Sequence, residues 1–138
     1  MPDQKSSLSV PHHGNRKIIT KTKRCVRERV RDAKMSKKAV LPNLDHFSLS
    51  DYGNFYEPSE DTYLLCDAIL QEVDAIANIV RPKICVEIGC GSGCVINFAY
   101  SALYDRGLKD IIYYATDINP HACEATRRTS EANKVTII

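Results

Sequence analysis

Apolar residues first become regular after residue 58, where a helical period begins. Ser59 follows Pro58 and suits a helix N-cap, and acidic residues fill the first turn beyond it. Apolar side chains then recur at steps of 4, 4, 3 and 4, at Leu65, Ile69, Val73, Ile76 and Val80. This spacing predicts an amphipathic helix over residues 59–80, which Pro82 breaks.

Two short apolar runs further along the chain have the composition of strands. The first is ICVEI at 84–88, which is apolar on both faces, as is typical of a parallel strand buried on both sides. The second is IIYYAT at 111–116. A second helix is expected between them, with a turn over 105–110 after it and apolar positions at Val95, Phe98, Ala99, Ala102 and Leu103.

A third helix is expected to begin after Asn119, because Asn119 suits the cap and Pro120 stands at the first helical position. It should run to about Asn133, and VTII at 135–138 should start a third strand. The order α-β-α-β-α-β predicts an α/β fold. Its first three parallel strands would form one half of an open sheet with right-handed crossovers.

Charge separates the chain into two segments. Residues 1–44 carry 12 Lys or Arg and 3 acids, a net charge of +9, whereas the other 94 residues carry 7 basic and 14 acidic groups, a net charge of −7. Residues 1–50 also lack a sustained period, so we expect a basic, disordered leader there and a folded domain over 51–138. A basic helix over 21–34 and a nucleic-acid-binding arm over 16–38 are the alternatives for this leader.

Composition also indicates a cellular setting. No run approaches the roughly 18 apolar residues that span a bilayer, and the N-terminus has no secretory h-region, so no membrane association is expected. Six cysteines form no C-x-x-C pair, and half of them lie in the first strand and the glycine loop after it. We therefore expect reduced thiols and a cytoplasmic or nuclear protein. No metal site is expected, since His12 and His13 have no partner ligands nearby.

A glycine loop, EIGCGSG at 87–93, connects the first strand to the second helix. Glycines at such a turn let the backbone approach a ligand and point free N–H groups at it. A P-loop would need a lysine after the glycines, and a dinucleotide fingerprint would need glycine at 94, where Cys94 stands. The pattern that remains is E-x-G-x-G-x-G, with Glu87 ending the strand and with Gly89 and Gly91 in the loop.

Asp117 follows the second strand, 28 residues after Gly89. A carboxylate at this place reaches the ribose hydroxyls of a bound nucleoside. The alternative is that Asp117 only begins the turn before the Asn119–Pro120 cap. The glycine loop one βα unit upstream favours the ribose role.

The run FYEPSEDT at 55–62 resembles the Y-E-P-x-E-D-T segment of HemK-type methyltransferases, in their eukaryotic and archaeal branch. TDINP at 116–120 and NKV at 133–135 are similar to the same branch, and EIGCGSG resembles motif I of class I methyltransferases. The resemblance covers about residues 55–138. It implies the N-terminal half of a Rossmann-like methyltransferase domain that binds S-adenosylmethionine.

The same resemblance assigns roles to individual residues. It implies that Glu87 accepts from the ammonium group of the cofactor, that Gly89 and Gly91 pass close to it, and that Asp117 holds its ribose. In the family the helix that this segment opens closes over the cofactor, which gives Thr62 a ligand contact. Three neighbouring acids are expected to be mainly structural: Glu57, Glu60 and Asp61.

The resemblance also implies a reaction and two partners. HemK-type enzymes of this branch methylate the side-chain amide nitrogen (N5) of the glutamine in the Gly-Gly-Gln loop of the class I translation termination factor. They work with a small zinc-binding activator subunit. The family's catalytic Asn-Pro-Pro-Tyr motif is absent from this sequence, so no catalytic residue is assigned. We expect the chain to be truncated and inactive alone.

Other functions stay open at the level of sequence. The substrate could instead be a histone lysine, a protein arginine, a small molecule or a nucleic acid. The chain could also be a nonenzymatic fragment that only binds the activator subunit. The YEPSEDT run favours the glutamine methyltransferase over these alternatives.

Removing the basic leader should not change the stability of the folded part. Met35 lies just before the change in sequence character, and we interpret it as a candidate true start of the protein. Because residues 1–34 lack the apolar period needed to bury a core, a chain that begins at Met35 should melt at the same temperature as the 138-residue chain. A clear drop in the melting temperature would show that the leader packs on the domain.

Overall fold

The computed structural model describes residues 39–138. The expected basic helix over 21–34, the nucleic-acid-binding arm over 16–38, the paired histidines at 12 and 13, and Cys25 lie outside the described residues. The described residues belong to one compact unit. Its main elements are three helices and two parallel strands: α2 (Glu60–Ala75), β1 (Ile84–Ile88), α3 (Cys94–Asp105), β2 (Ile112–Thr116) and α4 (Pro120–Ala132). The α/β fold predicted from the sequence is therefore confirmed, and the predicted order of elements holds as far as the third helix.

Helix α2 begins as its sequence predicts. Ser59 has extended backbone angles at the N-cap, and its backbone N–H donates to the Thr62 hydroxyl at 3.3 Å. Asp61 in the first turn accepts from the Ser59 hydroxyl at 2.9 Å. A carboxylate and a reciprocal cap at this end satisfy donors that a helix leaves unpaired.

The end of this helix departs from a regular α-helix. A π-helical segment, η2 (Ile76–Val80), continues α2, and Arg81 closes it in the left-handed region with φ 50°. Of the five apolar positions predicted to line one face, Val73 is buried and Ile69 and Ile76 pack against the core, as expected. Leu65 and Val80 are exposed instead, and Cys66 is buried. Val80 leaves the buried face because it lies in the π-helical segment, which does not keep the α-helical period.

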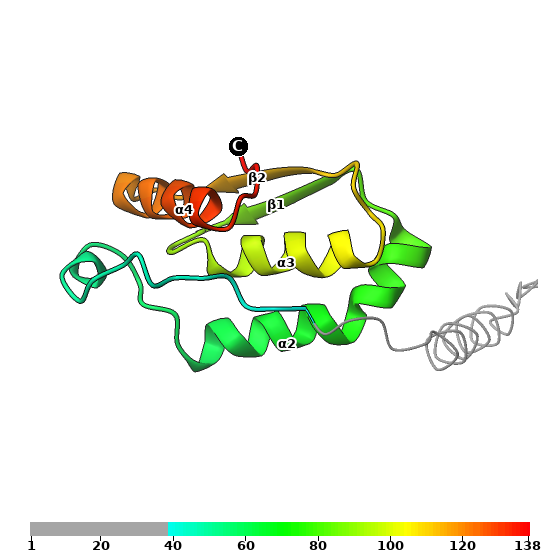
Figure 1. Ribbon diagram of the computed structural model, residues 1–138, viewed down its shortest axis with the longest axis horizontal. Coiled ribbons are helices and arrows are strands. Elements are labelled where there is room, and N and C mark those ends of the chain that lie inside the picture. Colours follow the sequence, from blue (N-terminus) through cyan, green and yellow to red (C-terminus); the bar gives the residue numbers. More distant parts are fainter. Residues whose placement is uncertain (1–38) are drawn as a thin grey trace, which may run out of the picture. The chain divides into compact units, whose positions relative to one another are not determined.

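Helix α3 lies between α2 and the sheet, so the described part of the chain has three layers (Figure 1). The α2–α3 interface holds the core, made of Ala39, Cys66, Val73, Phe98, Ala102 and Leu103. On the other side of α3, the Tyr113 ring of β2 is buried and lies 5.2 Å from the Tyr100 ring. Burial of such apolar side chains is the main force holding these layers together.

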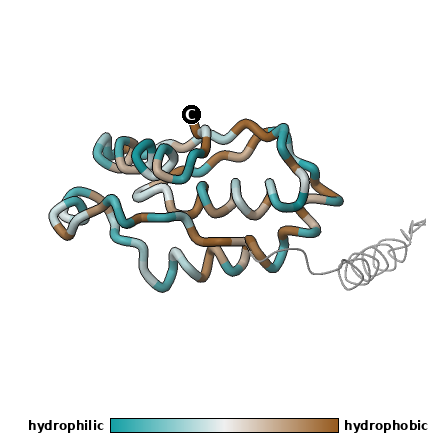
Figure 2. Tube along the Cα trace, in the orientation of Figure 1, coloured by the Kyte–Doolittle hydropathy of each residue, from teal (hydrophilic) through white to brown (hydrophobic). Residues whose placement is uncertain are grey.

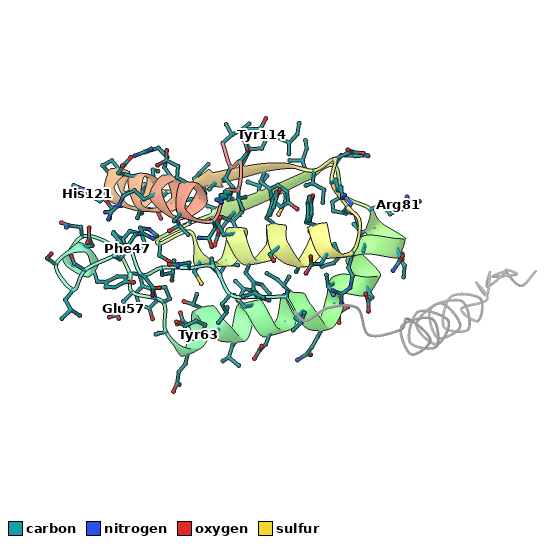
Figure 3. The ribbon with its side chains drawn as sticks, viewed as in Figure 1. Phe47, Glu57, Tyr63, Arg81, Tyr114 and His121 are labelled. Carbon is teal, nitrogen blue, oxygen red and sulfur yellow. The ribbon has the colours of Figure 1, made fainter. Side chains whose placement is uncertain are left out.

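The two strands pair in parallel, from Ile84 opposite Ile112 to Ile88 opposite Thr116. Side chains alternate along each strand, so one face of the pair meets α3 and the other does not. Figure 2 shows hydrophobic colouring along both strands, and in Figure 3 Tyr114 projects away from α3. The expectation that the first strand is buried on both sides is wrong for this structure, because no described element covers the face formed by Ile84, Val86, Ile88, Ile112 and Tyr114.

The expected third strand over 135–138 is not formed as a strand. Only its last residue pairs with β2: Ile138 donates to the Tyr113 carbonyl at 2.9 Å and accepts from the Ala115 N–H at 2.8 Å. That pattern is a single parallel ladder position opposite Tyr114. The turn after α4, with Lys134 at φ 57°, brings the chain beside β2 only at Ile138.

Residues 39–50 belong to the folded body, although the sequence placed them in the leader. Ala39 is buried in the core. Asn43 exchanges two hydrogen bonds with the Asn133 side chain, at 2.8 and 2.9 Å. The domain boundary expected at residue 50 therefore lies too far along the chain, because these contacts join residues 90 positions apart and leave no local period.

Two further properties concern the described residues alone. Across residues 39–138, no helix combines the length and the apolar character that a bilayer span requires. The cysteines of this part carry free thiols, at positions 66, 85, 90, 94 and 123. The prediction of reduced thiols is met for these five.

Gly93 should be far less tolerant of a side chain than Gly107. Both glycines have φ in the left-handed region, at 77° and 84°. A Cβ at Gly93 would lie 2.8 Å from the Thr126 Cα, whereas a Cβ at Gly107 meets nothing within 4 Å. Gly107→Ala should lower the free energy of unfolding by about 1 kcal/mol through backbone strain alone. Gly93→Ala should cost about 1–3 kcal/mol more, because backbone must move.

Denaturant titration of both variants measures this difference. Equal losses of stability would contradict the close contact between the glycine loop and α4.

Candidate functional site

The glycine loop between β1 and α3 turns at the carboxyl ends of both strands. The Thr116 carbonyl accepts two hydrogen bonds from this loop, from Gly89 N–H at 2.7 Å and from Cys90 N–H at 3.1 Å. Gly89 and Gly91 have φ of 79° and 52°, and a Cβ on either would point into open space. The backbone at Gly89 and Gly91 is therefore accessible, at the edge of the sheet where ligands bind in open α/β folds.

Asp117 follows β2 at the same edge. Its two carboxylate oxygens each accept from a backbone N–H, Oδ2 from Gly91 at 3.0 Å and Oδ1 from Asn119 at 2.9 Å. These hydrogen bonds hold the pKa of Asp117 below its usual range. Asp117 thus begins the turn before α4, which was the alternative role predicted from the sequence. It is also hydrogen-bonded to the glycine loop. Each oxygen retains a lone pair for a hydroxyl donor.

Glu87 is the last residue but one of β1, and its side chain reaches the first turn of α3. Its Oε2 accepts from the Ile96 N–H at 3.0 Å, which satisfies one of the unpaired donors at that helix end. Burial raises the pKa of Glu87 from its usual value near 4.5 to about 7, with the nearby charge of Asp117 adding to the rise. A carboxyl group of this kind gains most from a cation placed beside it.

Thr62 stands on a different element from the other predicted residues. It is the third residue of α2, half-buried, and its hydroxyl accepts from Ser59 N–H in the cap. Asp117 is hydrogen-bonded to Gly91 of the glycine loop, and Glu87 is hydrogen-bonded to Ile96 in the helix that follows this loop. No such bond links Thr62 to them, so its ligand contact stays a prediction.

Helix α4 also holds the glycine loop in place, a contact that was not predicted from the sequence. The Thr126 hydroxyl donates to the Gly91 carbonyl at 3.3 Å, and the Thr129 hydroxyl donates to the Ser92 carbonyl at 2.7 Å. Both threonines are buried. Buried threonines on a mostly polar helix were the available signal, but their partners lie 35 and 37 positions away.

The arrangement suits a ligand that offers hydroxyl and cationic groups. Asp117 is a carboxylate held in its charged form, and Glu87 is a carboxyl group with a pKa of about 7. The glycine backbone beside them has open space around it. Among residues 39–138, no cluster of three His, Cys, Asp or Glu side chains could hold a metal ion. The Asn-Pro-Pro-Tyr sequence does not occur in the 138 residues.

Comparisons with known proteins agree with this chemistry. No family model matches the chain. It is similar to "Methyltransferase HEMK2" of Homo sapiens, with 39% identity over 98 residues, which is 71% of this chain and 42% of that protein. The Mus musculus protein of the same name is 39% identical over 68% of this chain and 41% of its own length.

A third relative comes from a fungus. The "eRF1 methyltransferase catalytic subunit mtq2" of Schizosaccharomyces pombe is 33% identical over 95 residues, which is 67% of this chain and 40% of that protein. The chain thus spans about two fifths of the length of the curated relatives that it matches.

Replacing Glu87 by glutamine should change how stability depends on pH. Because the pKa of Glu87 is raised to about 7 in the folded chain, the folded state binds its proton more tightly than the unfolded state. Stability is therefore full below about pH 4.5 and falls as the pH rises through 7. Glu87→Gln keeps an acceptor for Ile96 N–H but cannot ionise. At pH 8 it should exceed the wild type by about 1–3 kcal/mol.

Urea titrations at pH 4.5 and pH 8 measure the two free energies of unfolding. They should coincide at the lower pH and separate at the higher. A constant difference between variant and wild type would show that Glu87 has an ordinary pKa.

Proposed function

The chain belongs to the HemK-type methyltransferases, and from this premise we propose that its glycine-loop edge binds S-adenosylmethionine. The single observation that carries the proposal is the hydrogen bond from Gly91 N–H to Asp117. It joins the motif I loop to the acid after the second strand, which is where a nucleoside needs both backbone and carboxylate. The relatives' names support a methyltransferase of this kind.

The residues present fit this cofactor. Asp117, charged because its pKa is lowered, would accept from the two ribose hydroxyls. The amino-acid end of the cofactor carries an ammonium group, and Glu87 would ionise beside it. Gly89 and Gly91 would let the backbone approach the ligand, because neither position holds a Cβ that would fill the open space. When bound, the cofactor supplies an electrophilic sulfonium methyl group. Thr62, at the start of α2, is assigned a further contact by family resemblance.

For the whole protein we propose N5-methylation of a glutamine side chain in the class I translation termination factor. The name of the fungal relative, an eRF1 methyltransferase catalytic subunit, supports this substrate. An amide nitrogen is a weak nucleophile, so the reaction depends on positioning by an Asn-Pro-Pro-Tyr motif, which a further segment would have to supply. The small zinc-binding activator subunit and a cytoplasmic or nuclear location belong to the same proposal.

Two experiments test the proposed cofactor and the proposed substrate independently. Calorimetric titration of the 138-residue chain with S-adenosylhomocysteine tests binding at the glycine loop. For the substrate, the chain is joined to the part of the human relative beyond the match, with the activator subunit present. A Gly-Gly-Gln peptide and its Gly-Gly-Asn counterpart are then compared by mass spectrometry. Methylation of the glutamine peptide alone supports the proposal, and methylation of neither peptide contradicts it.

Asp117→Ala should weaken the binding of S-adenosylhomocysteine by about 1–3 kcal/mol, because ribose hydroxyls and two backbone N–H groups lose their acceptor. Asp110→Ala is the matched control, since Asp110 is an exposed acid before the opposite end of β2. It should leave the affinity unchanged. If calorimetry gave the same affinity for both variants as for the wild type, the ribose assignment would be wrong.

A further inference from the structure

Residues 43–55 form a strap that runs along one side of α4 before α2 begins. Its contacts with α4 start at Asn43, which pairs with Asn133, and end at Asn54. Figure 1 shows this segment in cyan to green at the α4 end of the molecule, and Figure 3 places Phe47 close to that helix. The strap is thus held at both ends, and a charged group holds its middle.

Arg128 of α4 is that group, and it makes three different contacts with the strap. One guanidinium nitrogen donates to Asp51 Oδ1 at 2.8 Å, and another donates to the His46 carbonyl at 2.9 Å. The guanidinium carbon lies 4.8 Å from the centre of the Phe47 ring. A planar, permanently charged fork can satisfy a carboxylate, a carbonyl and an aromatic face together, whereas an ammonium group cannot match this geometry.

The strap side of this contact is itself ordered around Asp51. The Ser48 backbone N–H and hydroxyl both donate to Asp51 Oδ2, at 2.7 and 2.6 Å. These bonds, together with Arg128, hold the pKa of Asp51 well below its usual range. Three aromatic rings pack beside it, with centroids 5.0 to 5.7 Å apart: Phe47, Tyr52 and Phe55. Arg128 therefore meets a carboxylate and an aromatic ring that the strap's own contacts also hold, and its part is to fasten this segment to α4.

The far end of the strap reaches the loop that carries Asp117. The Asn119 side chain donates to the Asn54 carbonyl at 2.7 Å, while its backbone N–H donates to Asp117 Oδ1 at 2.9 Å. The other oxygen of Asp117 accepts from Gly91. A continuous series of hydrogen bonds thus runs from the strap, through Asn119 and Asp117, to the glycine loop.

We propose that Arg128 is a positioning residue: it fastens the strap to α4, so that Asn54 holds Asn119 and Asn119 orients the Asp117 carboxylate for its ligand. This inference deepens the proposed function and rests on it for the identity of the ligand. Among the described residues, Arg128 makes no hydrogen bond or ion pair with the glycine loop, so its effect on the site passes through the strap. Loss of Arg128 should make residues 46–54 more mobile, and the ligand should then dissociate faster.

Arg127 provides a matched control on the same helix. It is exposed and pairs with Glu124 and Glu131, one turn away on either side, and it makes no contact with the strap. Arg127→Gln and Arg128→Gln therefore remove the same charge from neighbouring positions, and only the second removes the strap contact. Arg128→Lys keeps the charge but loses the fork, which separates geometry from electrostatics.

The experiment uses the complete 138-residue chain with three readouts. Amide hydrogen exchange without ligand reports on strap opening; in Arg128→Gln it should quicken about tenfold over residues 46–54 and stay unchanged in the core of α3. The amide resonances of Gly91 and Asn119 report on the Asp117 carboxylate and should shift. Stopped-flow dissociation of S-adenosylhomocysteine should also quicken about tenfold, a fold-change within ordinary coupling between sites. Arg127→Gln should change none of these, and Arg128→Lys should fall between.

The outcomes separate the inference from the proposed function. Unchanged strap exchange in Arg128→Gln, or an equal rise throughout the chain, overturns the positioning role. Quicker strap exchange with unshifted Gly91 and Asn119 resonances overturns the link to Asp117. If the wild type binds no S-adenosylhomocysteine, the proposed function fails, while exchange and resonances still decide whether Arg128 holds the strap and orients Asp117.

Discussion

The parallel pairing of β1 with β2 is the constraint on which the site depends. Because both strands run the same way, their carboxyl ends meet at one edge, and residues 28 positions apart become neighbours there. The Thr116 carbonyl then accepts both Gly89 and Cys90 N–H groups, which fixes how the glycine loop leaves the sheet. Glu87, the last residue but one of β1, and Asp117, the residue after β2, are thereby brought to the same edge of the sheet as this loop.

The surroundings of the two carboxyl groups at this edge shift their pKa values in opposite directions. Burial raises the pKa of Glu87 to about 7, whereas backbone N–H donors lower the pKa of Asp117. Two charged carboxylates near each other repel. Because burial raises the pKa of Glu87, this group is partly protonated near pH 7, and the repulsion is reduced. A ligand with hydroxyl groups at one end and a cation at the other matches this division better than a phosphate does.

Helix α4 connects this edge with the rest of the described chain. On one side its threonines hold the glycine loop, and on the other Arg128 holds the strap. The contact at Gly93 is so close that only glycine fits beside Thr126. The face of β1 and β2 that points away from α3 is instead lined by exposed apolar side chains.

The sequence by itself determined the elements and the motif, because those signals are local. Ser59, Asn119 and Pro120 mark helix starts through their own backbone and side-chain preferences, and the E-x-G-x-G-x-G loop is defined by spacing. Tertiary structure alone decided the rest. It placed residues 39–50 in the domain, left Leu65 and Val80 exposed, reduced the third strand to one paired residue, and made Arg128 a strap contact. Partners 77 positions apart, such as Arg128 and Asp51, meet only after folding, so no local pattern records them.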